Sequence, residues 1–167
     1  MAKRRGFLAS GLAIVFVAIQ WLGPVQSNPP VVPSHTMQSQ IPVPPPVAAI
    51  LNRSCMDCHS DETHWPLCGR IAPVSWWLVD NVNSARRAMN LSEWTRYRPA
   101  YALATLTAMS EAVKKHAMPP DSYLEFHPQG GISDDERMTL SDWAQSERYR
   151  LQDELLNNNK KAKMAKP

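Results

Sequence analysis

The sequence predicts a mostly α-helical protein, with a small domain of about four helices preceded by a hydrophobic helix at the N-terminus. Between residues 47 and 150, apolar residues recur at spacings of three and four, the period of an amphipathic helix. Proline and capping residues stand where these segments begin. No segment has the alternating, β-branched pattern that indicates a strand.

Each of the four helices has a start signal of its own. The first is a short apolar run that follows Pro46. Ser75 can cap the second helix, and Pro99 suits the first turn of the third. Ser133 and Glu136 have the spacing of a capping box, which opens the fourth. The ranges expected for these helices are 47–51, 76–89, 99–116 and 133–150.

Residues 55–59 read Cys-Met-Asp-Cys-His, and this pentapeptide is the most specific signal in the chain. Two thiols three positions apart can each add to a vinyl group of haem, and the adjacent imidazole can then coordinate the iron. Three Cys and five His among 167 residues make a chance occurrence of this spacing rare. The motif therefore predicts one covalently attached haem c and its iron, held by Cys55 and Cys58, with His59 as the proximal ligand.

Two other interpretations of the cysteine pair stay open. A zinc site on Cys55 and Cys58 needs two more ligands, which His59, His64 and Cys68 could supply by spacing. A thioredoxin-like redox pair would require a βαβ pattern around the motif, and none is present.

The N-terminal end is typical of an exported protein. Basic residues 3–5 precede an apolar run from Phe7 to Leu22. This run is long for a signal peptide but shorter than the roughly 20 residues that span a bilayer. Cleavage before Asn28 and retention as a membrane anchor through residues 7–22 are therefore both open. Either outcome places the domain on the periplasmic side of the bacterial inner membrane, where thiols can be joined to haem.

This organisation divides the chain into four parts. Seven prolines in the second part favour extended polyproline segments without a packed core, so we expect a stiff linker there. The parts are a signal peptide or membrane anchor over 1–27, the Pro-rich linker over 28–46, the haem-binding domain over 47–150, and the end of the last helix with a basic flexible tail over 151–167.

The charge distribution excludes one class of partner. All 15 acidic residues lie between Asp57 and Glu154, whereas seven of the 18 Lys and Arg lie near the two ends. The middle of the chain is therefore net negative and lacks the basic patch that nucleic-acid binding needs. Basic protein surfaces are the expected partners of the domain, although the sequence does not name the redox partner.

Met118 is the candidate for the second axial ligand of the iron. It stands before Pro119 and Pro120, which stiffen the chain after the third helix and can hold one side chain toward the iron. The rival ligands are His64, His116 and His127, and an open site is the remaining alternative. The other methionines have simpler assignments, with Met89, Met109 and Met138 expected in the core and Met37 and Met164 in flexible ends.

Several residues are candidates for supporting roles. His59 needs an acceptor for its second ring nitrogen, and a backbone carbonyl within residues 71–73 is a plausible provider. Arginines and tryptophans could bind the haem propionates, although they are more often solvated or in the core. We expect the odd cysteine to be a small buried hydrophobe, with a free thiol as the alternative. The residues concerned are Arg86, Arg87, Trp65 and Trp94 for the propionates and Cys68 for the odd thiol.

A series of motifs in order resembles the bacterial haem-binding domain family of cytochrome c type. The resemblance covers about Val47 to Arg150 and implies a monohaem, cytochrome c-like helical domain. It also implies that Cys55 and Cys58 hold the haem, with His59 proximal and Met118 distal. The motifs are Cys58-His59-Ser60, Thr63-His64-Trp65-Pro66, Ile71-Ala72-Pro73-Val74-Ser75-Trp76, Asn90-Leu91-Ser92-Glu93-Trp94, Met118-Pro119-Pro120 with Tyr123, and His127-Pro128 ahead of Ile132-Ser133.

The chain departs from this family in three places. Relatives often carry His-Val where Asn81-Val82 stands, Gly-Arg where Ala85-Arg86 stands, and an aromatic residue where Cys68 stands. The change at Asn81 removes a competing His ligand and so favours Met118. The change at Ala85 puts a close approach of the backbone to haem in doubt.

The expected function is electron transfer by a monohaem carrier with His/Met ligation, which breaks no substrate bond and is not enzymatic. The alternative is a haem-based sensor or a small peroxidase-like enzyme, in which Met118 leaves the iron to admit a gas or a peroxide.

Overall fold

The computed structural model describes residues 2–164, and within that range it is helical without a strand, as expected. The longer helices are α1 (Ala2–Gln20), α3 (Pro45–Ser54), α5 (Val74–Ala88), α6 (Pro99–Lys114) and α8 (Asp134–Met164). Single helical turns connect them: η1 (Pro33–His35), α2 (Met37–Gln40), α4 (Met56–His59), η2 (Leu67–Arg70), η3 (Leu91–Arg96), α7 (Asp121–Leu124) and η4 (Pro128–Gly130).

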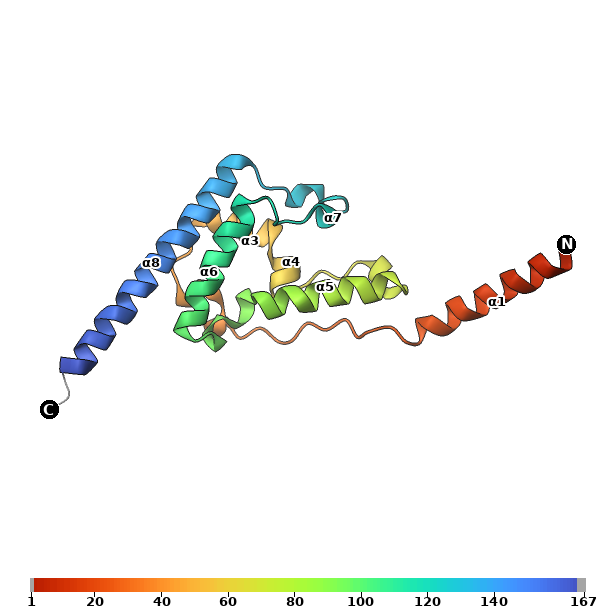
Figure 1. Ribbon diagram of the computed structural model, residues 1–167, viewed down its shortest axis with the longest axis horizontal. Helices are drawn as coiled ribbons and strands as arrows, with labels where there is room; N and C mark the ends of the chain where they lie inside the picture. The colour runs from red at the N-terminus through yellow and green to blue at the C-terminus, as the bar shows by residue number, and fades with distance from the viewer. Residues whose placement is uncertain (1, 165–167) are drawn as a thin grey trace.

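The core lies where α3, α6 and α8 meet. Helices α6 and α8 lie side by side and run in opposite directions, and α3 packs against α8 (Figure 1). Leu106 on α6 and Leu140 and Ala144 on α8 have no exposed surface. Apolar side chains on one stripe of each helix therefore bury one another.

The capping box at the start of α8 is confirmed. The backbone N–H of Ser133 donates to Glu136 Oε2 at 3.0 Å, and that of Glu136 donates to Ser133 Oγ at 3.3 Å. Glu136 also pairs with Arg53 at the end of α3, at 2.9 Å. The same carboxylate thus caps α8 and ties it to the helix that leads into the cysteine motif.

The Pro-rich segment is part of the core, which corrects the expectation of a linker over 28–46. Met37 is 1% exposed and Ile41 3%, and both join the apolar cluster of α6 and α8. The indole N–H of Trp143 donates to the carbonyl of Pro42 at 3.0 Å. The segment includes η1 and α2, and two of its apolar residues, Met37 and Ile41, are buried while Val32 is exposed. Met37 is therefore a core residue, not part of a flexible end.

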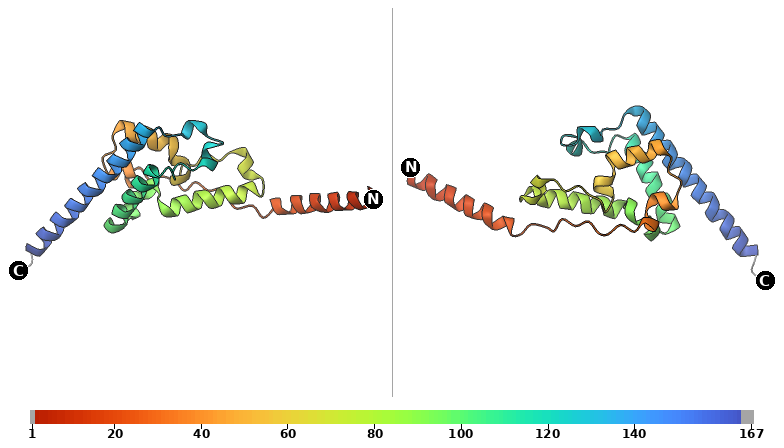
Figure 2. Two further views of the ribbon diagram at one scale, coloured as in Figure 1. Left: turned by 45° about the horizontal axis from the view of Figure 1, so that its top comes forward. Right: turned by 180° about the vertical axis from the view of Figure 1, so that it is seen from behind.

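The apolar N-terminal run forms the expected helix, α1, which extends away from the domain (Figure 2). Among residues 2–164, no helix combines the length and the apolar character needed to cross a membrane. Helix α1 has 19 residues and includes Lys3, Arg4 and Arg5, so its apolar part falls short of the roughly 20 residues that a bilayer requires. A transmembrane helix is therefore not supported.

Other expectations differ in detail. Helix α5 begins after Pro73 and not at a Ser75 cap, and the hydroxyl of Ser75 is buried without a partner. Met138, expected in the core, is 57% exposed. Cys68, expected to be buried, is exposed. The basic tail continues as helix to Met164, where the described residues end.

Candidate functional site

The cysteine motif forms one short turn of helix between α3 and α5. Cys55 ends α3 with φ −126° and ψ −36°, and α4 follows directly. The carbonyl of Cys55 accepts from the N–H of Cys58 at 3.2 Å and of His59 at 2.9 Å. Residues three and four positions apart on a helical turn face the same side. The turn therefore brings Cys55, Cys58 and His59 together, as the motif predicts.

Both thiols of the motif are partly buried and neither is in a disulfide. Burial raises the pKa of the Cys55 thiol to about 12, and the neighbouring Cys58 adds to the shift. Burial also raises the pKa of Cys58, with a further contribution from Asp57. Both groups are therefore protonated thiols at neutral pH, and the folded environment does not activate them as thiolates.

The imidazole of His59 is hydrogen-bonded within the protein through Nδ1. Nδ1 lies 3.0 Å from the carbonyl oxygen of Met89, at the end of α5. A carbonyl only accepts, so this hydrogen bond requires the proton on Nδ1 and leaves the lone pair on Nε2. The carbonyl of Ala85, also on α5, is a second backbone partner of this imidazole. Burial lowers the pKa of His59, which also favours the neutral, metal-binding form.

The acceptor for His59 was expected within residues 71–73, and the structure places it at Met89 instead. Sequence reasoning assigned Met89 to the core by its side chain, which is indeed 9% exposed. Its backbone role carries no sequence signal, because every residue has a carbonyl. The break between α5 and η3, marked in the sequence by Asn90-Leu91-Ser92, was the only available hint.

A buried polar network fixes the chain on both sides of that carbonyl. The side-chain amide of Asn90 donates to Asp61 Oδ1 at 3.0 Å, and its Oδ1 accepts from the N–H of Ser92 at 2.9 Å. The N–H of Asp61 donates to the hydroxyl of Ser92 at 3.1 Å. All three side chains are at most 7% exposed. The loop after His59 is thereby locked to the loop that supplies its acceptor.

Arg86 closes this network from α5. Its Nε donates to the carbonyl of Ser60 at 2.7 Å and lies 3.7 Å from the carboxylate of Asp61. Its other donors bond to Ser27, Asn28 and Thr63, which are all residues of the protein. Arg86, one of the candidates for propionate binding, stabilises the chain next to His59.

The other candidates for propionate binding also have partners within the protein. The indole N–H of Trp65 donates to Asn28 Oδ1 at 3.0 Å. Trp94 is buried and packs edge-on against Tyr97 at 5.2 Å. Arg87 is exposed and donates to Ser84 Oγ at 2.7 Å. The plainer assignment holds for Trp94, which is a core residue.

Met118 lies in the loop between α6 and α7, and its side chain is 39% exposed. The backbone of this loop is held firmly, because the N–H of Met118 donates to Ala112 at 3.3 Å and its carbonyl accepts from Arg137 at 3.0 Å. Helix α7 then returns to the motif, where the hydroxyl of Tyr123 donates to Asp57 Oδ2 at 3.3 Å. Tyr123 is therefore the residue that links the Met118 loop to the motif.

Gly130 makes this link sterically possible. A Cβ at this position would lie 2.7 Å from Cε1 of Tyr123, closer than side chains tolerate. The ring of His127 stacks on the other side of Tyr123, with centroids 4.4 Å apart. The tyrosine is thus held between a glycine and an imidazole.

The other histidines considered as iron ligands are His64, His116 and His127. Nδ1 of His64 lies 2.8 Å from Asp57 Oδ1, while its side chain is 91% exposed. His127 faces the carbonyl of Tyr123 at 3.2 Å in addition to the stacking contact. His116 is exposed and ends α6 with φ 56°.

Apolar side chains are exposed around α5 and α7. The turn α4 packs near the C-terminal end of α5, where His59 reaches the carbonyl of Met89, whereas α5 begins at the end farther from α4 (Figures 1 and 2). Ile71, Val74 and Trp77 are between 41% and 50% exposed on the α5 side, and Phe126 is 73% exposed beyond α7. The thiol pair and the imidazole of His59 fit the chemistry of haem.

The zinc interpretation finds no such support. Within the described part of the chain, no three His, Cys, Asp or Glu residues are arranged to hold a metal ion. A structural zinc site requires four ligands.

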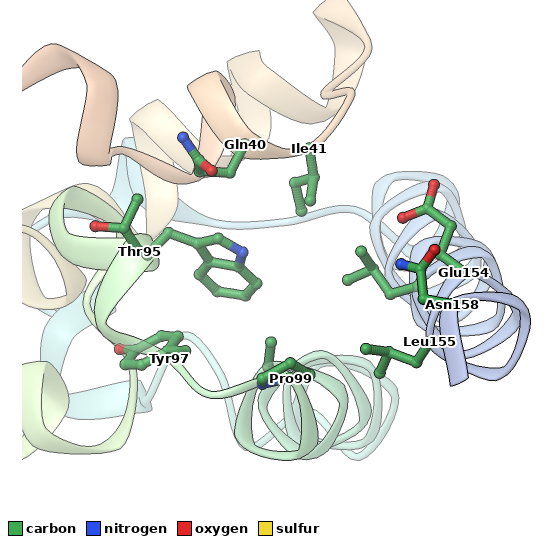
Figure 3. A pocket seen from close by; sticks show the side chains of 11 residues that line it. Gln40, Ile41, Thr95, Tyr97, Pro99, Glu154, Leu155 and Asn158 are labelled. Atoms are coloured by element: carbon green, nitrogen blue, oxygen red, sulfur yellow. The ribbon is translucent and has the colours of Figure 1, made fainter. Parts of the chain in front are cut away.

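A pocket lies elsewhere in the fold. It has a volume of about 310 Å³ and opens between α2, η3, α6 and α8 (Figure 3). Tyr97 and Pro99 line one wall, and Leu155 and Asn158 another. None of the residues of the cysteine motif, nor Met118, lines it.

The family of the chain follows from a comparison with protein-family models. The model described as "Haem-binding domain" matches residues 14–146. The chain belongs to the haem-binding domain family. The match includes the cysteine motif, the Met118 loop and the Pro-rich segment, and it supports haem as the cofactor. No curated protein and no solved structure matches the chain.

Proposed function

We propose that this protein is a monohaem c-type cytochrome that carries electrons on the periplasmic side of the bacterial inner membrane. Cys55 and Cys58 hold the haem covalently, His59 is the proximal iron ligand and Met118 the distal one. The orientation of His59 carries the proposal, because Nδ1 is bonded to the carbonyl of Met89 and Nε2 is left for iron.

Attachment joins each thiol to a vinyl group. The sulfur forms a carbon–sulfur bond and the thiol hydrogen passes to the neighbouring vinyl carbon, so no electrons are gained or lost. Burial keeps Cys55 and Cys58 protonated in the folded chain. Attachment is therefore favoured before the domain closes around the motif, while the thiols are still accessible.

The chain's own residues set the conditions for electron transfer. Haem iron supplies a one-electron ferrous–ferric couple when bound. The imidazole of His59 is fixed by Met89, and a thioether from Met118 raises the potential relative to a second histidine. The net negative charge of residues 57–154 favours a redox partner with a basic surface. No substrate bond is broken in this role.

The location rests on the N-terminal segment. Basic residues 3–5 and the apolar run after them are typical of export. Leu12, Phe16 and Trp21 are 49% to 87% exposed, so α1 leaves apolar surface that a lipid surface would cover. The domain is attached to the membrane through residues 7–22, or it is released by cleavage.

The test is Met118→Ala, with Met138→Ala as the matched control on the exposed face of α8. We expect wild type to retain haem on a denaturing gel and to show a six-coordinate, low-spin spectrum with the weak band of Met on ferric iron. Met118→Ala should lose that band and turn high-spin, while Met138→Ala keeps it. A gel without haem-bound protein would refute covalent attachment, and a wild-type spectrum for Met118→Ala would refute this ligand.

The exposure of Met118 favours one second candidate. A side chain that is 39% exposed in a loop can leave the iron more readily than a buried one, as a haem sensor or a small peroxidase-like enzyme requires. Rapid binding of carbon monoxide to the ferrous protein at neutral pH would support this function. Slow or absent binding supports electron transfer alone.

A further inference from the structure

Residues 20–28 do not lead freely away from α1 but are hydrogen-bonded along η2 and α5. We call this segment the strap (Figure 1). At its start, the N–H of Ala72 donates to Gln20 Oε1 at 2.8 Å, and Gln20 Nε2 donates back to the carbonyl of Ala72 at 3.4 Å. The indole N–H of Trp76 donates to the carbonyl of Leu22 at 3.2 Å. The end of α1 is thereby held against the beginning of α5.

The middle of the strap fits a glycine on η2. Nε2 of Gln26 donates to the carbonyl of Gly69 at 2.7 Å. A Cβ on Gly69 would lie 2.8 Å from that nitrogen and 2.7 Å from Leu78 Cδ2. The side chains of Gln26 and Leu78 therefore pack closely against Gly69 and would have to move to admit a side chain there.

The end of the strap reaches the network beside His59. Arg86 donates to the carbonyl of Ser27 at 2.8 Å and to Asn28 Oδ1 at 3.0 Å. The amide of Asn28 donates to the carbonyl of Thr63 at 2.9 Å. The same guanidinium also holds Ser60, the residue after the proximal histidine. The strap thus helps to place the arginine that stabilises the motif.

We propose that the strap is a permanent part of the haem domain, so that the mature protein keeps residues 20–28 together with α1 and is not cut before Asn28. Cleavage there would remove Leu22, the acceptor of the Trp76 indole, and Gln26, the donor to Gly69. It would also take Ser27 from Arg86, which keeps Asn28, Ser60 and Thr63. The fold therefore uses residues on both sides of the possible cut. This inference rests on the proposed export of the chain but not on its haem.

The direct test is the intact mass of the mature protein. The full chain is produced in a host that attaches haem c, and the protein is isolated from the cell envelope. We expect a mass that includes all of residues 20–28 and α1. A mature N-terminus at Asn28, or at any residue from 21 to 28, would overturn the proposal. The mass added by haem is read in the same spectrum, so failure of haem attachment is seen separately.

Limited proteolysis tests the strap itself. Leu22 and Val25 are 72% and 82% exposed, and thermolysin cleaves before such residues when the backbone is free. We expect slow cleavage there in the full-length holoprotein and several-fold faster cleavage in Gln26→Ala and Asn28→Ala. Pro30→Ala, just beyond the strap and exposed, is the control and should match wild type. Equal rates in all four proteins would show that the strap is not held.

Discussion

The imidazole of His59 is oriented by a residue 30 positions away in the sequence. The pentapeptide requires an imidazole beside the cysteines, but it does not say which nitrogen faces the iron. The carbonyl of Met89 decides that, and Asn90, Asp61 and Ser92 hold the carbonyl in place. Because Asn90 bonds to both Asp61 and Ser92, its removal should have a measurable effect on stability.

Asn90→Ala tests this network. Loss of the amide removes one buried hydrogen bond from Asp61 Oδ1 and leaves the N–H of Ser92 without its acceptor, which costs about 1 to 3 kcal/mol of unfolding free energy. We expect the haem to remain attached, since both thiols are unchanged, and the reduction potential to shift because the His59 hydrogen bond is loosened. Urea unfolding and a redox titration measure the two effects. Asn81→Ala, at an exposed site of α5, is the control and should leave both values unchanged.

The three cysteines should behave differently although all are free thiols. Cys55→Ala and Cys58→Ala each leave one thioether, so haem stays on the chain with a shifted absorption band, and the double variant loses covalent haem. Cys68→Ala should retain normal haem, because Cys68 is exposed and lies outside the α4 turn. A haem stain and the reduced pyridine spectrum read the result. Loss of haem from Cys68→Ala would contradict the assignment.

Among the helices, the predicted starts were confirmed where the signal depends on residues close together in the sequence. Helix α6 begins at Pro99, and α8 begins with the Ser133 capping box. The start of α5 was predicted too late in the sequence. The helix begins after Pro73, and no side chain caps it. The turn before it is set by the strap, which bonds Ala72 from outside the helix.

Glu136→Gln tests the link between α8 and α3. The N–H of Ser133 and the guanidinium of Arg53 lower the pKa of Glu136. A lowered pKa means that the carboxylate adds stability above its unfolded pKa, and this stability is lost as the pH falls below about 4.5. We expect Glu136→Gln to unfold more readily than wild type at pH 7 and to differ less at pH 3.5. Thermal unfolding followed by circular dichroism at both values measures this. A difference that grew at low pH would contradict it.

At the scale of the whole molecule, the chain before the cysteine motif wraps around the domain. The strap lies along η2 and α5, and Met37 and Ile41 belong to the apolar core. The folded domain therefore begins well before residue 47, in agreement with the family match over residues 14–146.

Met37→Ala tests this wrapping. Removal of a side chain that is 1% exposed leaves a cavity in the core, and we expect a loss of about 2 to 5 kcal/mol in unfolding free energy. Met138→Ala makes the same chemical change at a side chain that is 57% exposed and should cost little. Urea denaturation of the holoproteins gives both values. Equal stability of the two variants would mean that residues 28–46 are a linker after all.

The sequence alone was enough for features that depend on a few neighbouring residues. The signals at Pro99 and Ser133 predicted two helix starts, and both are confirmed. The spacing within residues 55–59 predicts haem attachment, which stays a prediction. Composition was a poorer guide to residues 28–46, because proline content reports the backbone's preference and not what its apolar neighbours pack against. The expectation that Cys68 is buried was wrong, because composition does not show which side chains the fold covers.

Only the tertiary structure decided which distant surfaces meet. The bond from His59 to Met89 joins residues 30 apart, and that from Trp143 to Pro42 joins residues 101 apart. The bonds of the strap to Ala72, Trp76 and Arg86 span more than 50 residues each. Backbone carbonyls and buried apolar positions look alike in any sequence, so their partners are fixed by packing, which minimises exposed apolar area and unpaired polar groups over the whole chain at once.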